Sequence, residues 1–288
     1  MTAVFTKARP DAPPGFFACE AAGLGWLRVP GGPRVVGVRD VGETHLDLER
    51  VEQARATAEA ARDLGRRLAV LHDAGAPGWG SPSADWAGDG FFGPLDDPLA
   101  MPTGAWPDWP TFYAQARLAP VARQGRERGA LTADDARLLE RLGERLADLA
   151  RPALDDVPAR LHGDLWSGNV LWSPRQDAGG PDADGPGVDG PGVDRPGVGG
   201  GPGVDAVLID PAAHGGHREA DLAMLALFGA PHLDEIVAGY QERHPLARGW
   251  RHRVTLHQVY PVAVHAVLFG GSYVPQLRAS VTALLDGR

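Results

Sequence analysis

The first 51 residues alternate short apolar runs with turn residues, a pattern typical of small β-structures. Residues 3–7 (AVFTK) predict a strand, and residues 16–27 carry apolar side chains at a helical period up to the breaker Val-Pro-Gly-Gly-Pro at 29–33. Two further apolar runs, 34–40 and 44–51, are separated by a Val-Gly-Glu turn. We therefore expect a strand, a helix and a hairpin-like pair of strands in this part of the chain.

From residue 52 onward the hydrophobic pattern becomes helical. Residues 53–73 are rich in Ala, Leu and Arg and stop before Gly75, which predicts one long helix. Residues 76–107 are dense in Gly, Pro, Asp and Trp, and they predict a loop. A new helix is expected near Asp108, with Pro110 in its first turn.

Thr132 and Asp135 stand three residues apart before another helical pattern and predict a capping box. The apolar stripe that follows predicts core packing and consists of Leu138, Leu142, Leu146 and Leu149. Residues 218–285 predict several more helices, each with one apolar face. The coarse expectation is a small β-containing part, 1–51, followed by a large helical part, 52–288.

The segment 177–205 differs from the rest of the chain. Gly-Pro-Gly-Val-Asp occurs at 185–189, 190–194 and 201–205. With six aspartates and one arginine, the segment carries −5 of the net charge of −9. Repeated Pro blocks helices and repeated Gly raises the entropy lost on ordering, so we expect a flexible insertion in a hairpin or loop rather than a structured repeat.

Composition excludes several classes of protein. The chain of 288 residues can bury a core without covalent staples, and its one cysteine, Cys19, excludes an intramolecular disulfide or a multi-cysteine metal site. We interpret Cys19 as a small buried hydrophobe. The N-terminus lacks an apolar export core and no run of about 18 apolar residues appears, so we expect a cytoplasmic protein that spans no membrane. Net acidity argues against a general nucleic-acid binder.

Lys7 is the only lysine in the sequence, since 27 of the 28 basic residues are arginine. A compact ammonium can do what a planar guanidinium cannot, so a lysine that persists in such a composition is a functional candidate. Chance retention near a terminus is the alternative. The residues alone leave this choice open.

The stretch LHGDLWSGNVLW, residues 161–172, carries the strongest chemical signal. Asp164 and Asn169 lie five residues apart, and past the insertion the apolar run 207–210 ends on Asp210. This arrangement suits phosphoryl transfer, in which one Asp accepts the proton of the attacking hydroxyl while an Asn and a second Asp hold magnesium. A loop with a capping aspartate is the alternative reading of the His-Gly-Asp triplet alone.

These motifs resemble those of fructosamine (ketosamine) kinases, relatives of aminoglycoside and choline kinases. The matching stretches are HGDLWSGN at 162–169, IDPA at 209–212, GHREADLAM at 216–224, DWPTFYAQARLAP at 108–120, DGFFG at 89–93, VFTK at 4–7 and FFACEAAGLGWL at 16–27. The resemblance covers nearly the whole chain, with 177–205 inserted. It implies an α+β, bilobal, protein-kinase-like fold with a small β-containing lobe, 1–51, and a large, mostly helical lobe, 52–288.

The resemblance also implies roles for individual residues. Asp164 would be the catalytic base, and Asn169 and Asp210 would hold Mg²⁺. Lys7 would contact the α- and β-phosphates of ATP with Glu20 as its ion-pair partner. The linker that meets adenine would consist of Glu49, Arg50 and Val51. Trp166 would face the sugar or its amine. His162 and Asp221 would support the catalytic loop. Lobe packing is the alternative for Trp166, and the nearby His214 and His217 are interpreted as local loop contacts rather than metal ligands.

The implied activity is ATP- and magnesium-dependent phosphorylation of the C3 hydroxyl of fructosamines or ribulosamines on lysine or protein amines, leading to deglycation. The implied partner is a small-molecule or protein-linked ketosamine, with no nucleic acid or membrane. One departure matters: only six residues precede Lys7 and none is glycine, so the Gly-rich hairpin that covers the phosphates is missing. The start codon is assigned too late, or the hairpin has been lost. The alternatives are therefore another small-molecule kinase, acting on an aminoglycoside or choline-like hydroxyl, and an inactive pseudokinase.

Overall fold

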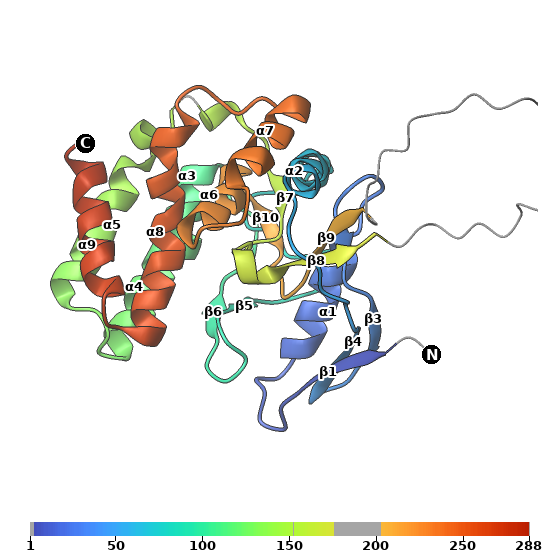
Figure 1. The fold of residues 1–288 in the computed structure, drawn as a ribbon. Coiled ribbons are helices and arrows are strands. Elements are labelled where there is room, and N and C mark those ends of the chain that lie inside the picture. The colour runs from blue at the N-terminus through green and yellow to red at the C-terminus, as the bar shows by residue number, and fades with distance from the viewer. Residues whose placement is uncertain (1–2, 152, 176–202, 288) are drawn as a thin grey trace, which may run out of the picture.

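A three-stranded antiparallel sheet in the order β1-β4-β3 opens the structure, a computed structural model that describes residues 3–151, 153–175 and 203–287. Its strands are β1 (Val4–Ala8), β4 (His45–Glu49) and β3 (Val38–Val41), and helix α1 (Phe16–Trp26) contacts β3 and β4. The first strand and the helix expected from the sequence are thereby confirmed, and the expected hairpin is present as the pair β3 and β4. Figure 1 shows this part beside a larger helical body.

The run 34–40 was expected to be a single strand, and this prediction is wrong. Its first half forms β2 (Arg34–Val35), which leaves the N-terminal sheet and pairs in parallel with β9 (Val204–Leu208). The break falls at Gly37, whose N–H donates to the Glu49 carboxylate at 3.2 Å. A Cβ atom at Gly37 would lie 2.6 Å from that carboxylate, so glycine permits the close approach.

The predicted insertion lies between two paired strands. Strand β8 (Val170–Pro174) is antiparallel to β9, and the sheet order is β2-β9-β8. Residues 176–202 lie outside the described residues, so the predicted flexibility of the insertion stays a prediction. Its expected end at residue 205 is too late, because Val204 and Asp205 already pair with β8.

Helix α2 (Ala58–Asp73) begins later than the predicted residue 53. Thr57 caps it, with its side-chain oxygen accepting from the N–H of Ala60 at 3.1 Å. The backbone of Thr57 itself is extended, and Ala54 before it donates its N–H to the carbonyl oxygen of Trp172 on β8. The preceding segment is thus held by the neighbouring sheet, and helix formation starts where a threonine can cap it.

Helix α2 packs against α7 (Leu233–Arg243) at two glycines. A Cβ atom at Gly65 would lie 1.9 Å from the carbonyl oxygen of Ile236, and one at Gly239 would lie 1.9 Å from the carbonyl oxygen of Arg62. Each helix therefore presents a glycine to the backbone of the other. This reciprocal contact brings the two helix axes closer than larger side chains would allow.

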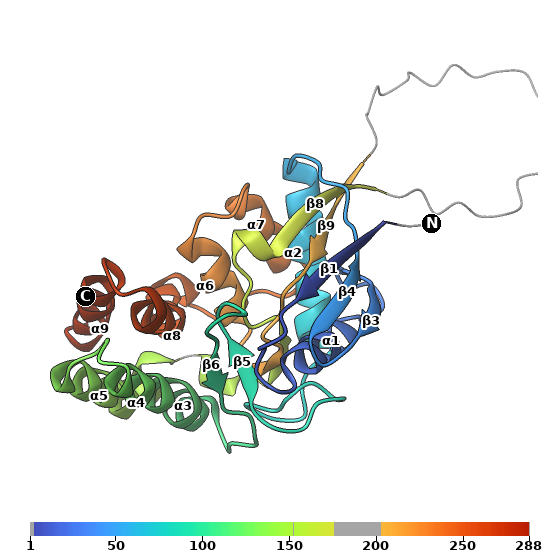
Figure 2. The same ribbon diagram turned by 90° about the horizontal axis from the view of Figure 1, so that it is seen from below.

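The remaining helices form the helical body that Figure 2 shows from below. They are α3 (Trp109–Tyr113), the π-helical turn η1 (Ala114–Leu118), α4 (Ala119–Glu127), α5 (Ala133–Leu149), α6 (Glu219–Leu227), α8 (Trp250–Phe269) and α9 (Tyr273–Leu285). Asp108 caps α3 and the Thr132–Asp135 capping box begins α5, as predicted. Of the α5 stripe, Leu142 and Leu146 are fully buried, while the other two leucines pack on the same core from its edge.

Two short antiparallel strand pairs complete the structure. The segment predicted as loop contains β5 (Gly90–Phe92) and β6 (Leu99–Met101), an antiparallel pair too short to show a strand period in the sequence. Strand β7 (Ala159–Leu161) pairs with β10 (His214–Gly216), which brings the two chain segments on either side of the insertion together. Short 3₁₀ turns occur at η2 (Ala153–Asp155) and η3 (Ser167–Asn169). Among the described residues, no helix is long and apolar enough to cross a membrane.

Candidate active site

The loop between β7 and β8 carries Asp164 and Asn169. The Asn169 amide nitrogen donates to the Asp164 carbonyl oxygen at 2.8 Å, to the Asp164 carboxylate at 3.1 Å and to the Asp210 carbonyl oxygen at 3.3 Å. One buried side chain thus ties the two aspartates together. Gly163, just before Asp164, has φ +84°, and a Cβ atom there would lie 2.1 Å from the carbonyl oxygen of Ala212. Only glycine fits that turn.

Asp164 lies in a setting that disfavours its charged form. Burial raises the pKa of Asp164 to about 7, and the negative charges of Asp210 and Asp221 add to the rise. The hydrogen bond from Asn169 opposes it. A carboxyl group with a pKa near neutrality can exchange a proton at physiological pH, which suits acid–base work.

Lys7 and Glu20 meet across the N-terminal lobe. The Lys7 ammonium on β1 donates to both carboxylate oxygens of Glu20 on α1, at 2.8 and 2.9 Å, and to Asp210 at 3.2 Å. Burial lowers the pKa of Lys7, but the two carboxylates outweigh it and the net shift is upward. Burial raises the pKa of Glu20 to about 7 despite the opposing effect of Lys7.

Asp210 connects the two halves of the site. It follows β9, has φ +52°, and contacts Lys7 through its side chain and Asn169 through its carbonyl oxygen. A positive φ is uncommon for a residue with a side chain, although Asp tolerates it better than most. The neighbouring Ile209 N–H donates to the Asn169 carbonyl oxygen at 3.1 Å, which fixes β9 against the catalytic loop.

Asp221 and His162 hold the loop from behind. The Asp221 carboxylate on α6 accepts from the N–H groups of His162 at 2.8 Å and Gly163 at 2.9 Å, and it faces the His72 ring at 3.1 Å. Burial would raise the pKa of Asp221, but these hydrogen bonds and the two histidines keep it low. Burial lowers the pKa of His162, so its neutral ring donates from Nε2 to Ile209 and accepts the Asp164 N–H at Nδ1.

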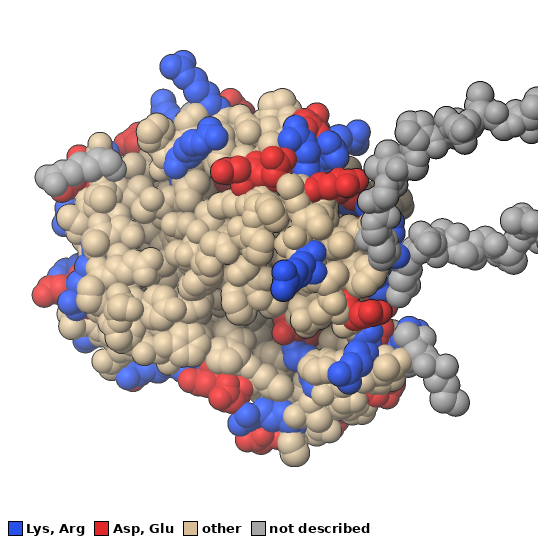
Figure 3. Space-filling model, viewed as in Figure 1, with Lys and Arg blue, Asp and Glu red and all other residues tan. Residues whose placement is uncertain are grey.

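A cavity of about 340 Å³ lies between the two lobes. The sequence-predicted residues that line it are Lys7, Glu20, Asp164, Trp166, Asn169 and Asp210. Figure 3 shows a largely uncharged face that is hollowed where the N-terminal part meets the helical body. Three carboxylates and one ammonium therefore share a single cleft.

The linker residues are not among those that line the cavity. The Glu49 side chain forms an ion pair with Arg34, the Arg50 N–H donates to the carbonyl oxygen of Ala3, and Val51 packs at the edge of the core. The Glu49 and Val51 side chains and the Arg50 N–H thus make contacts away from the cavity.

One wall of the cavity comes from α8 and was missed in the sequence. Val264, His265, Leu268 and Phe269 line it. His265 lies 5.4 Å from Phe269 and 5.1 Å from Phe228 between ring centres, and Phe228 contacts the indole of Trp166 at 6.0 Å. The spacing of these residues in the sequence predicts an apolar helix face. The same spacing occurs whether such a face borders a cleft or the core, so it does not predict the cavity wall.

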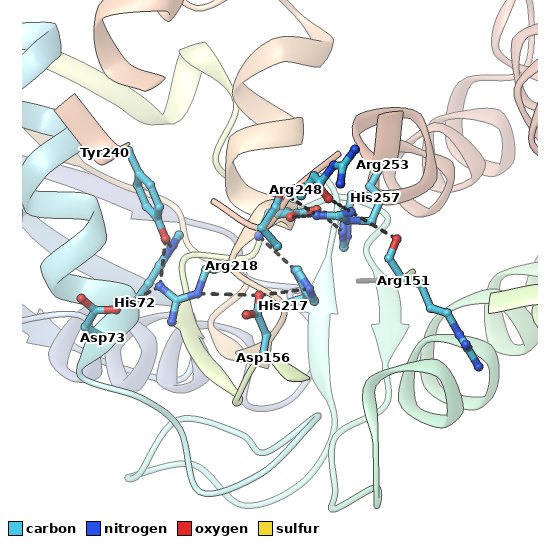
Figure 4. Close-up of polar contacts among 12 residues, drawn as sticks. His72, Asp73, Arg151, Asp156, His217, Arg218, Tyr240, Arg248, Arg253 and His257 are labelled. Atoms are coloured by element: carbon cyan, nitrogen blue, oxygen red, sulfur yellow. Dashed lines mark hydrogen bonds and ion pairs between the residues drawn. The ribbon is translucent and has the colours of Figure 1, made fainter. Parts of the chain in front are cut away.

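A second titratable cluster lies outside the cleft. His217, Glu219 and His257 are buried and close enough to hold a metal ion. Both Glu219 oxygens accept from Arg253, at 2.5 and 2.9 Å, so a guanidinium already neutralises the carboxylate. Figure 4 shows His217 turned toward Asp156, an ion-pair contact of 3.4 Å. We therefore assign no metal to this cluster.

Comparison with known proteins identifies the family. The model of the fructosamine kinase family matches residues 1–287, essentially the full length. The chain belongs to the fructosamine kinase family. The resemblance drawn from the catalytic-loop motif is thus confirmed, and this fructosamine kinase family member is a phosphotransferase.

Individual relatives of this kinase agree. A crystal structure from Thermobifida fusca, named "putative fructosamine-3-kinase", is 44% identical with a TM-score of 0.80, over 99% of this chain and 86% of that chain. The "Probable ketoamine kinase" of Enterococcus faecium is 30% identical over 279 residues, 96% of this chain and 85% of the relative. Choline kinase LicA from Streptococcus pneumoniae, at 13% identity over 99% of this chain and 86% of that chain, shares the fold with a TM-score of 0.56. The expected bilobal, kinase-like α+β fold is confirmed.

Proposed function

We propose that this kinase transfers the terminal phosphoryl group of ATP to the C3 hydroxyl of a fructosamine or ribulosamine, and that the phosphorylated adduct then leaves the amine. The observation that carries the proposal is the convergence of Lys7, Asp164, Asn169 and Asp210 on one cleft. Phosphoryl transfer needs a base, cation ligands and a phosphate contact in this arrangement.

Asp164 acts as the base in this proposal. With a pKa of about 7, its carboxylate is available above neutrality and accepts the proton of the attacking hydroxyl. Asn169 turns its amide nitrogen toward Asp164, which orients the loop, and no described residue donates to its side-chain oxygen, which can therefore bind a cation.

The donor set fits Mg²⁺. Asp210 and Asn169 offer a carboxylate and an amide oxygen, the hard ligands that magnesium prefers. Burial, with the negative charge of Asp210 adding to it, raises the pKa of Asp164 and of Glu20, and a divalent cation in the cleft would favour their charged forms. When bound, Mg²⁺ would neutralise charge on the nucleotide phosphates.

Lys7 contacts the phosphates in this proposal, with Glu20 holding its ammonium in the cleft. When ATP binds, the phosphate oxygens replace Asp210 as a partner of Lys7, and Asp210 becomes free for the cation. We further propose that adenine meets the segment of Glu49, Arg50 and Val51, which begins at the last residue of β4 and leads into the second lobe.

The acceptor enters beside Trp166. Its indole is 39% exposed at the cleft, and Phe228, His265 and Phe269 extend the aromatic surface. An aromatic face attracts the cationic amine that links the sugar to lysine. We also propose a cytoplasmic location, since a single thiol suits a reducing compartment.

The test is ADP release from Mg-ATP with ribulosamine-modified lysine, unmodified lysine, choline or an aminoglycoside as the acceptor. The proposal expects release that depends on the sugar amine and a product phosphorylated at C3, identified by NMR. Release with choline or the aminoglycoside alone would establish a different small-molecule kinase. No release with any acceptor would favour the inactive alternative.

A further inference from the structure

A second, smaller cavity of about 40 Å³ lies behind the catalytic loop. Gly163 lines it on the loop side, and Arg117, His214 and Tyr260 line it from the helical body. Phe92 borders both this cavity and the active-site cleft. None of the residues assigned to phosphoryl transfer lines the smaller cavity.

Arg117 is the unusual member of this lining. Its side chain is 1% exposed, and one terminal nitrogen, Nη1, donates to the carbonyl oxygens of Pro102 and Ala116 at 2.9 and 2.8 Å. The other, Nη2, is buried and has no hydrogen-bond partner within the described parts of the chain. The guanidinium lies over the rings of Phe112 and Tyr260, at 4.6 and 5.5 Å.

The charge of Arg117 has no acidic partner among the residues that the structure describes. Burial lowers its pKa, despite the nearby tyrosines and the charge of Asp89. Among the described residues, no aspartate or glutamate lines the cavity. A buried charge without a counter-ion is strongly unfavourable, so native proteins pair such charges.

A second buried polar atom belongs to another residue that lines this cavity. Nδ1 of His257 has no hydrogen-bond partner in the described residues, while its Nε2 lies 3.4 Å from the Glu219 carboxylate. His257 and His217 both line the cavity, and Figure 4 shows His257 beside Arg253. When Nδ1 carries a proton, it offers the cavity another donor.

We propose that this cavity binds one small monovalent anion of the size of chloride, with Arg117 as its counter-charge. A water molecule could accept from Nη2 but would leave the guanidinium charge uncompensated. The volume has room for roughly two or three waters, or for one monatomic anion. A tetrahedral oxyanion with its four oxygens would not fit.

The test compares thermal unfolding in sodium bromide with that in sodium gluconate at equal ionic strength. Above the dissociation constant, each tenfold rise in bromide should raise the Tm of the unmodified protein by about 3 °C relative to gluconate, because the anion binds only the folded state. Arg117→Met should abolish this difference. The matched control is Arg123→Gln, which removes an exposed arginine from α4 and should keep the full bromide effect.

Equal Tm values in bromide and gluconate, or a bromide effect that persists in Arg117→Met, would overturn the proposal. If Arg117→Met does not fold, crystals of the unmodified protein grown in bromide decide the question. An anomalous peak within hydrogen-bond distance of Arg117 Nη2 supports the anion site. Water density there without an anomalous peak overturns it.

Discussion

At the scale of single residues, the site concentrates negative charge where a base and a cation are needed. Asp164 and Glu20 each have a pKa of about 7, and burial is the largest cause for both. The same buried carboxylates that make the proposed chemistry possible therefore oppose folding at high pH.

Replacement of Asp164 by Asn should lower kcat by about 10²- to 10⁴-fold, because the loop keeps its shape and loses its base. Steady-state ADP release measures this. Asp155→Asn, at an exposed carboxylate in the same region, is the control and should retain normal turnover. A near-normal rate in Asp164→Asn would remove Asp164 from the role of base.

The value of kcat/KM should fall as the pH decreases through about 7, because protonation of Asp164 in the free protein removes the acceptor for the hydroxyl proton. A pH profile of kcat/KM between pH 5.5 and 9 tests this, with both substrates held below their KM. A profile that stays flat down to pH 5.5 would contradict it.

The stability of Asp164→Asn should exceed that of the unmodified protein at pH 8. The folded-state pKa of about 7 lies above the ordinary value of 3.8, so the charged carboxylate destabilises the fold above about pH 7. The penalty shrinks as the pH falls from 7 toward 4, and its upper limit is about 4 kcal/mol. Urea denaturation in EDTA at pH 8 and pH 5 measures it, and the gain should be larger at pH 8.

Much of the site could be predicted from the sequence because its residues lie in contiguous motifs. Asp164 and Asn169 lie in one short loop, and Lys7 is marked as a candidate because it is the only lysine in the sequence. His265 and Phe269 were missed because they line the cleft from α8. The helical period of the sequence predicts an apolar face but not the part of the protein against which that face packs. Arg117 was visible only as part of a longer motif, since burial without a counter-charge cannot be read from spacing.

At the scale of elements, the local signals for helix starts were reliable where side chains cap the helix. Thr132 and Asp135 form the predicted box, whereas α2 starts late because Ala54 is bound by β8. The contact of α2 with α7 had no local signal. From the sequence alone, Gly65 and Gly239 are simply residues of low helix propensity. Their role in the close contact becomes apparent only once the opposing backbone is known.

Gly65→Ala should destabilise the protein by about 2–4 kcal/mol, because the added methyl would lie 1.9 Å from the Ile236 carbonyl oxygen and force the helices apart. Gly143→Ala on α5 is the matched control. The nearest atom to its added methyl is the Ala114 side chain at 3.5 Å, so a gain of about 0.5–1 kcal/mol is expected from helix propensity. Chemical denaturation measures both, and equal effects would disprove the close helix contact.

At the scale of the whole molecule, the proposed boundary at residue 51 divides a chain whose two parts share a sheet. Strand β2 from the first part pairs with β9 from the second, and one apolar cluster includes residues of both. The sequence could not predict this pairing, because β2 has only two residues and its partner follows the insertion.

Deletion of residues 177–202 should change the Tm by only a few degrees, because the closure entropy of a connecting segment varies slowly with its length. Extending the deletion to residue 205 should cost more, since it removes the pairing of Asp205 with Ser173 and the ion pair of Asp205 with Arg175. Differential scanning calorimetry compares the two variants. A large loss of stability in the shorter deletion would contradict the prediction drawn from its composition.

The pairing of β2 with β9 also bears on how the chain is made. Arg34 stands opposite Val207, so an early segment must wait for a partner that leaves the ribosome about 170 residues later. At roughly 5–20 residues per second, that delay is on the order of 10–30 s, and the insertion lengthens it. During this interval the nascent N-terminal lobe has an unfinished core, and chaperones have their best opportunity to bind it.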